Sequence, residues 1–188
     1  MNILVACEFS GRVRDAFLRK GHRAVSCDFL PCESKYPGEH YQGNVMDILH
    51  KKWNRLIAFP DCTYRANSGV RWIINNLQRQ EELRKADEFF NLLLDSDIPE
   101  ICIENPIPHH YSKVRKYDQI IQPWMFGDNE SKSTCLWLKG LPKLIPAIRV
   151  KPNNIKHSIH KMAPSHNRSH LRSITFPGIA NAMSNQWG

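Results

Sequence analysis

Short apolar runs alternate with longer amphipathic segments at the start of the chain, and this alternation predicts alternating strands and helices. Residues 3–7 are rich in β-forming side chains and lead into a polar, glycine-containing turn over 8–11. A helical pattern then begins near Val13 and closes at Gly21, and residues 23–28 are typical of a second strand. A strand, a tight turn, a helix and a second strand make a βαβ unit with a parallel sheet.

The rest of the chain adds strands and helices to this unit. A long helical pattern spans 70–94, with charged side chains on one side and apolar ones on the other, and a short helix is expected over 177–188. Residues 151–170 are basic and poor in apolar periodicity, so we expect a long surface loop there. Further strands are expected at four short apolar runs: 56–59, 98–103, 135–138 and 145–150. The whole pattern predicts one α/β domain with an open, mostly parallel sheet and helices on both faces.

Composition and charge narrow the class of protein. The 188 residues fit one domain over 1–188, and 26 Lys and Arg against 18 Asp and Glu favour an anionic partner, nucleic acid first. No apolar run approaches the roughly 20 residues of a membrane span, so we expect no membrane partner and no signal peptide. Six cysteines without a CxxC pair indicate reduced thiols and a cytoplasmic protein.

Polar groups at strand ends are the first candidate site, because ligands of open α/β sheets bind just past the carboxyl ends of the strands. Gly11 in the first turn allows close backbone approach, and the helix that follows presents free N–H groups. Asp28 ends the second strand, where such folds use an acid to hold a ribose. An ordinary turn and a solvated acid are the structural alternatives for these two features.

A cysteine and a glutamate at two further strand ends point to catalysis. Pro60 stops a strand, so Cys62 is expected in a loop at the sheet edge, where nearby positive charge can make it a thiolate. Glu104 ends another strand, beside Asn105. Together the two form a nucleophile and a proton donor suited to an electron-poor ring, although either one alone is more often structural.

These stretches, in this order, resemble motifs of the DNA cytosine-5 methyltransferase family. Residues 8–11 resemble its first motif, which holds S-adenosylmethionine, and residues 60–62 resemble its Pro-Cys nucleophile motif. Residues 103–106 resemble its Glu-Asn-Val motif, and residues 179–183 are similar to the Gly-Asn-Ala-Val helix start that completes the cofactor pocket. The likeness is to short phage- and prophage-type members, covers nearly the whole chain and implies a Rossmann-like methyltransferase fold.

The resemblance implies transfer of a methyl group to C5 of cytosine in DNA, in a bacterial or phage-infected cell. Cys62 would add to C6 while Glu104 hydrogen-bonds N3 and the exocyclic amine, and a base in a duplex must first be flipped out. The implied cofactor-binding residues are Glu8, Phe9, Ser10, Gly11, Asp28, Asp47 and Asn181. The implied substrate-binding residues are Pro60, Thr63, Asn105, Pro106, Lys132 and Arg172.

The sequence departs from the family pattern at four points. Asp61 stands where the family has Pro, and a carboxylate there opposes thiolate formation. Val13 replaces the second Gly of the first motif, and Asn44 stands where related short sequences carry an acid. The chain also has no room for a large target-recognition domain, which leaves residues 122–170 as a reduced DNA-contact region.

Two alternatives stay open at this stage. The chain could be a catalytically weak or inactive relative that binds nucleic acid or a host protein, or an enzyme that modifies another pyrimidine, a nucleotide or RNA. A metal site is not expected, because the histidines between 157 and 170 match no zinc spacing. A basic loop that touches phosphates is the favoured interpretation of that stretch.

Overall fold

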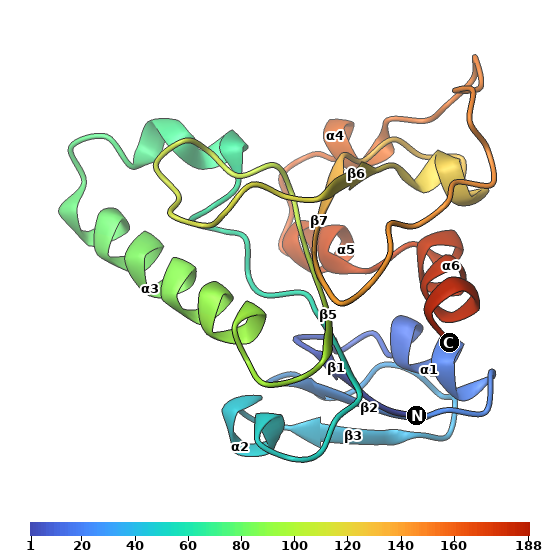
Figure 1. The fold of residues 1–188 in the computed structure, drawn as a ribbon. Coiled ribbons are helices and arrows are strands. Elements are labelled where there is room, and N and C mark those ends of the chain that lie inside the picture. The colour runs from blue at the N-terminus through green and yellow to red at the C-terminus, as the bar shows by residue number, and fades with distance from the viewer.

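A seven-stranded sheet forms the centre of the protein in the computed structural model, which describes residues 1–188 (Figure 1). Its strand order is β3-β2-β1-β4-β5-β7-β6. The first five of these strands are parallel, and β7 runs antiparallel to both of its neighbours. The strands are β1 (Asn2–Ala6), β2 (Arg23–Asp28), β3 (Glu39–Gln42), β4 (Arg55–Ala58), β5 (Glu100–Asn105), β6 (Gln119–Ile121) and β7 (Thr134–Lys139). The fold is Rossmann-like, as the sequence predicts.

Helices lie on both faces of this sheet. They are α1 (Arg12–Leu18), α2 (Met46–Leu49), α3 (Leu77–Leu94), α4 (Ser158–Lys161), α5 (Arg168–Ser173) and α6 (Pro177–Trp187), with 3-10 turns η1 (Asn67–Trp72) and η2 (Pro123–Phe126). None of the helices is long and apolar enough to cross a membrane.

The buried side chains form two clusters, one on each face. Along β1, Leu4 and Ala6 belong to the first cluster, whereas Ile3 and Val5 belong to the second. This division follows from the alternation of side chains along a strand. Both faces of β1 are therefore apolar and buried, which is why the strand is a continuous apolar run in the sequence.

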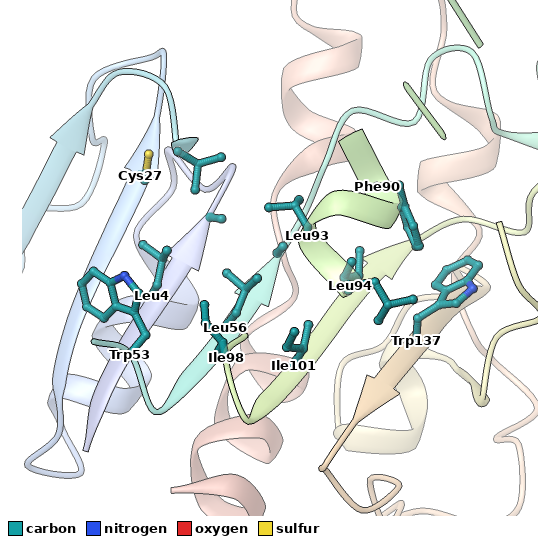
Figure 2. Close-up of a cluster of buried hydrophobic side chains, with 14 of the residues drawn as sticks. Leu4, Cys27, Trp53, Leu56, Phe90, Leu93, Leu94, Ile98, Ile101 and Trp137 are labelled. Carbon is teal, nitrogen blue, oxygen red and sulfur yellow. The ribbon is translucent and has the colours of Figure 1, made fainter. Parts of the chain in front are cut away.

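Helix α3 covers the first cluster, and α1 with α6 covers the second (Figure 1). Phe90 of α3 packs edge to face against Trp137 of β7, with ring centroids 5.0 Å apart. Figure 2 shows Leu94 of the same helix turned toward the strands. Phe17 of α1 and Met183 of α6 are fully buried in the second cluster. The prediction of helices on both faces is confirmed.

Several expected elements need correction. The helix predicted over 70–94 begins only at Leu77, because Asn75 has a left-handed φ of 58° and the Asn76 side chain caps the helix by accepting from the Arg79 N–H. The strand predicted over 145–150 is wrong, since that stretch has no regular structure and its end residues are exposed. The stretch 151–170 carries α4 and the start of α5 within its loops.

The expected DNA-contact region over 122–170 also needs correction, because part of it belongs to the central sheet. Strand β7 lies inside this region, pairs with both β5 and β6, and buries Cys135, Leu136 and Trp137 completely. Only the part after β7, residues 140–170, is mostly exposed. The exposed side chains of the region therefore lie mainly on those residues.

Candidate active site

A cavity of about 660 Å³ opens where four parallel strands end. Its walls come from the turns after β1, β2, β3 and β4, from one side of α3, and from residues at the end of α5. Its size is that of a site for a small molecule or cofactor. The polar and aromatic lining includes Glu8, Phe9, Ser10, Asp28, Asn44, Asp61, Tyr64, Lys85, Phe89, Ser173 and Thr175.

Glu8 shapes the turn between β1 and α1. Its carboxyl is buried and accepts hydrogen bonds from the backbone N–H groups of Val13 (2.6 Å) and Arg14 (3.2 Å). These bonds satisfy donors that a helix start leaves free. Burial raises the pKa of Glu8 to about 7, although the two hydrogen bonds act in the opposite direction. Glu8 therefore lines the cavity as part of the turn that supports it.

Gly11 does not line the cavity, although the sequence predicts that it binds cofactor there. Its φ is 69°, a conformation that favours glycine. A Cβ at this position would also lie 2.6 Å from the Ser34 Cβ. The glycine is required by the turn and by the close approach of Ser34.

Asp28 at the end of β2 lines the cavity. Its Oδ1 accepts a hydrogen bond from the Leu30 N–H (2.9 Å), and no protein group donates to Oδ2. Asp47, expected to act with it, lies outside the cavity and accepts from the Tyr41 hydroxyl (2.9 Å). Asn44 lines the cavity instead.

Asn181 is also placed away from the cavity. It is exposed on α6, the helix that packs against α1. Of the seven predicted cofactor-binding residues, four therefore line the cavity and three do not. The four are Glu8, Phe9, Ser10 and Asp28.

Cys62 and Glu104 are brought together by the pairing of β4 with β5. Ala58 pairs with Ile103, and the Asn105 Nδ2 donates to the Pro60 carbonyl oxygen over 2.7 Å. Glu104 belongs to β5 itself, whereas Cys62 lies in the loop after β4 and is half-buried. Neither side chain lines the cavity, whereas Asp61, the neighbour of Cys62 in the chain, does.

Burial and the neighbouring charges both act on the pKa of the Cys62 thiol. Burial raises its pKa above the ordinary value, and the charges of Asp61 and Glu104 add to the increase. Lys132 and Arg65 act in the opposite direction. A thiolate at this position therefore needs a proton acceptor or further positive charge, which a bound substrate complex would have to supply.

Burial likewise raises the pKa of Glu104. The Lys132 ammonium and the Thr134 hydroxyl act against this increase. A carboxyl with a raised pKa holds its proton to higher pH, and it can donate that proton or a hydrogen bond to a bound ring. The structure therefore places a thiol and a carboxyl with a raised pKa at the ends of neighbouring strands.

Replacing Asp61 by asparagine is expected to lower the pKa of Cys62, because one of the two anions that raise it is removed. A lower pKa gives more thiolate at pH 8, so alkylation by iodoacetamide becomes faster and its pH midpoint moves down. Mass spectrometry of the Cys62 peptide measures the rate without interference from other cysteines. Asp47→Asn, a change at an exposed acid outside the site, is the control, and an unchanged midpoint in Asp61→Asn contradicts the expectation.

Lys132 lies at the same site through a contact with α5. Its Nζ donates to the Arg172 carbonyl oxygen over 3.0 Å, and its charge acts on both Cys62 and Glu104. Arg172 thus contacts Lys132 through its backbone carbonyl oxygen, not through its side chain. Thr63 is exposed and donates to Asp61, with its hydroxyl 2.7 Å from Oδ1.

The two prolines among the predicted substrate-binding residues have different surroundings. Pro60 is buried, and its carbonyl oxygen accepts from the Asn105 amide. Pro106 is half-buried directly after β5. Asn105 is buried, and both ends of its amide are bonded within the protein. Pro60 and Asn105 therefore hold the strand ends together.

Helix α5 lies against the first turn. The His170 ring packs on the Phe9 ring at a centroid distance of 4.5 Å, and its Nε2 lies 2.9 Å from Glu33 Oε1. His170 thus packs on Phe9, a residue of the cavity lining, whereas Ser173 and Thr175 further along the chain line the cavity themselves.

No group of three or more His, Cys, Asp or Glu side chains is placed to hold a metal ion.

Arg65 is a buried residue of the site that the sequence does not reveal. It follows Cys62 by three positions and is 1% exposed. Its guanidinium bonds Asp87 and Asn105, which lie 22 and 40 residues away in the chain. An arginine in a polar stretch carries no sign of such distant partners, so only the fold identifies it.

Comparisons with known proteins give a likeness of fold alone. No family model and no curated protein matches the chain. The bifunctional kinase-methyltransferase WbdD matches with a TM-score of 0.41 at 12% identity, over 77% of this chain and 36% of WbdD. The Entamoeba histolytica methyltransferase EhMeth matches with a TM-score of 0.45 at 14% identity, over 90% of this chain and 62% of EhMeth. The chain thus spans less than two thirds of either protein, and the assignment of the fold rests on its own strand order.

Proposed function

We propose that this protein is an S-adenosylmethionine-dependent methyltransferase that acts on C5 of cytosine in DNA through a covalent bond to Cys62. The observation that carries the proposal is that Cys62 and Glu104 lie at neighbouring strand ends, near enough for the charge of Glu104 to act on the pKa of Cys62, at the sheet edge where Asp28 lines a cavity. Ligands of open α/β sheets bind at this edge. The resemblance of residues 8–11, 60–62 and 103–106 to motifs of cytosine-5 methyltransferases supports the same conclusion.

The residues of the cavity fit S-adenosylmethionine. Asp28 has a carboxylate oxygen without a protein partner, at the position where such folds hold ribose hydroxyls. Phe29, Val45 and Met46 give apolar surface for a purine. Carboxylates of Asp28 and Asp61 suit the positive charge of a sulfonium. When bound, S-adenosylmethionine supplies an electrophilic methyl group.

Cys62 and Glu104 activate the base in this proposal. The Cys62 thiolate forms a bond to C6, which makes C5 a nucleophile. Protonated Glu104 donates to N3 and stabilises the negative charge that the addition places on the ring, and its raised pKa keeps this proton available. C5 then forms its bond to the methyl group as the methyl–sulfur bond breaks. The C5 proton passes to solvent, the Cys62 thiolate leaves C6, and the proton on N3 returns to Glu104, which restores the ring.

A basic segment supports nucleic acid as the substrate. Residues 140–170 contain several Lys and Arg and no Asp or Glu, and most of them are exposed. This segment leads directly into α5, whose backbone binds Lys132 at the site. Cations of this kind contact phosphates and make binding depend on salt. A cytosine in duplex DNA must also leave the stack to reach Cys62.

Asp61 favours a second candidate function. Its charge raises the pKa of Cys62, whereas a nucleophilic cysteine needs to be a thiolate. On this candidate the chain is a weak or inactive relative that binds nucleic acid or a host protein. Nucleic-acid binding that survives Cys62→Ala, together with no affinity for the cofactor, would favour it. Labelled transfer to RNA or a free nucleotide, but not to DNA, would favour an enzyme with another substrate.

Replacing Asp28 by asparagine is expected to weaken binding of S-adenosylhomocysteine about tenfold, because a hydrogen bond to a charged acceptor contributes about 1.5–3 kcal/mol and a neutral one less. Isothermal titration calorimetry measures the affinity without any methyl acceptor. Asp47→Asn is the matched control, since Asp47 is an acid outside the cavity and bonds Tyr41. Equal losses in the two variants, or no binding by the unmodified protein, would contradict the assignment of the cavity.

A further inference from the structure

Arg65 is a buried cation beneath the loop that carries Cys62. Its Nε donates to Asp87 Oδ1 (3.0 Å), its Nη1 to Asn105 Oδ1 (2.7 Å) and its Nη2 to the Ala86 carbonyl oxygen (2.6 Å). The guanidinium also lies over the Phe90 ring, 4.5 Å from the centroid. Every nitrogen of the guanidinium is therefore bonded, and the group joins the loop to α3 and β5.

The contact with Asn105 links Arg65 to both strand ends of the site. Because the Asn105 amide oxygen accepts from Arg65, its nitrogen is free to donate to the Pro60 carbonyl oxygen at 2.7 Å. Asn105 follows Glu104 directly, and Pro60 lies two positions before Cys62. One guanidinium thereby fixes the amide that ties the Glu104 strand to the Cys62 loop.

Backbone hydrogen bonds close the same loop around Arg65. The N–H groups of Arg65 (3.1 Å) and Ala66 (2.9 Å) donate to the Cys62 carbonyl oxygen. The Arg65 carbonyl oxygen accepts from the His109 N–H at 3.0 Å. The short turn from Cys62 to Arg65 is thus held at both ends by backbone hydrogen bonds.

We propose that Arg65 is a positioning residue for Cys62 and Glu104, which acts through Asn105 and Pro60. This inference rests on the proposed function, because a role in positioning catalytic groups requires that function. Its first test, hydrogen exchange, does not depend on catalysis. A buried ion pair gives little net stability, and well-packed apolar residues often replace one without loss. The presence of the buried Arg65–Asp87 pair is therefore better explained by geometry than by stability. The planar guanidinium of Arg65 bonds several partners in fixed directions, which a lysine ammonium cannot do. The charge of Arg65 also favours the thiolate of Cys62.

The experiment compares Arg65→Lys with Arg55→Lys. Arg55 is a matched control, because it is also buried and paired, with Glu100, but lies at the start of β4 rather than after its end. Hydrogen exchange is followed at the backbone N–H groups of Thr63, Arg65 and Ala66, which the loop protects. We expect exchange there to become at least tenfold faster in Arg65→Lys and to stay unchanged in Arg55→Lys.

Methyl transfer gives the second readout. The kcat of Arg65→Lys is expected to fall at least tenfold with the KM for S-adenosylmethionine unchanged, while Arg55→Lys keeps its kcat within about twofold. If the unmodified protein transfers no methyl group, the proposed function fails and the exchange experiment still decides the role of Arg65. The inference is overturned if the loop N–H groups of Arg65→Lys exchange at the same rate as in the unmodified protein. It is also overturned if their exchange is faster but kcat is unchanged.

Discussion

Replacing Cys62 by alanine is expected to abolish methyl transfer to DNA while S-adenosylhomocysteine still binds. Without the thiol no bond to C6 can form, and C5 of cytosine is too weak a nucleophile to take the methyl group unaided. Cofactor binding should survive because Cys62 does not line the cavity. Transfer of a labelled methyl group measures the first effect, and calorimetry measures the second.

Cys32→Ala is the matched control for this variant, since Cys32 is also half-buried but lies near Arg14, away from β4 and β5. It should keep its activity. Transfer by Cys62→Ala at the rate of the unmodified protein would exclude Cys62 as the nucleophile. Loss of cofactor binding in the same variant would show that the substitution disturbs the fold instead.

Replacing Glu104 by glutamine is expected to lower kcat by about 10²–10⁴-fold, the usual contribution of a positioned acid or base. Glutamine keeps the shape of the side chain but cannot deliver a proton to N3. Burial raises the pKa of Glu104, and the proposed reaction uses its acid form, whose transferable proton the glutamine amide lacks. Steady-state kinetics with saturating DNA and cofactor measure the effect.

Glu100→Gln is the control on the same strand, because Glu100 pairs with Arg55 near the start of β5. This variant should lose stability but keep its kcat, whereas Glu104→Gln should lose kcat with little change in thermal midpoint. A kcat of Glu104→Gln within a few-fold of the unmodified protein would remove Glu104 from the mechanism.

The strands at the centre of the sheet are predictable from the sequence, and the edge strands are not. Strands β1 and β4 are buried on both faces and therefore form continuous apolar runs. Strand β3 reads Glu-His-Tyr-Gln, pairs only with β2 and is largely exposed, so no hydrophobic pattern marks it. The apolar run over 145–150 misleads for the opposite reason, since Ile145 and Val150 are exposed outside the sheet.

Within the candidate site, the sequence predicts the residues that directly follow a strand but not the partners that come from distant parts of the chain. Cys62 and Glu104 each follow an apolar run, and parallel pairing of neighbouring strands brings such ends together. Asp47 is an acid of the expected type, but it lies on the short helix α2 and bonds Tyr41, and it is Asn44 that lines the cavity. The partners of Arg65 are set by the packing of α3 on the sheet, which no local pattern encodes.

Capture of Cys62 on a modified base is the most direct measurement of the central claim. DNA that contains 5-fluorocytosine is incubated with the protein and S-adenosylmethionine, and the fluorine at C5 prevents the elimination that normally frees the cysteine. We predict a complex of one chain and one DNA strand that survives denaturation, depends on the cofactor and joins the DNA to the peptide that contains Cys62. An absent complex, or a link at any residue other than Cys62, would contradict the account.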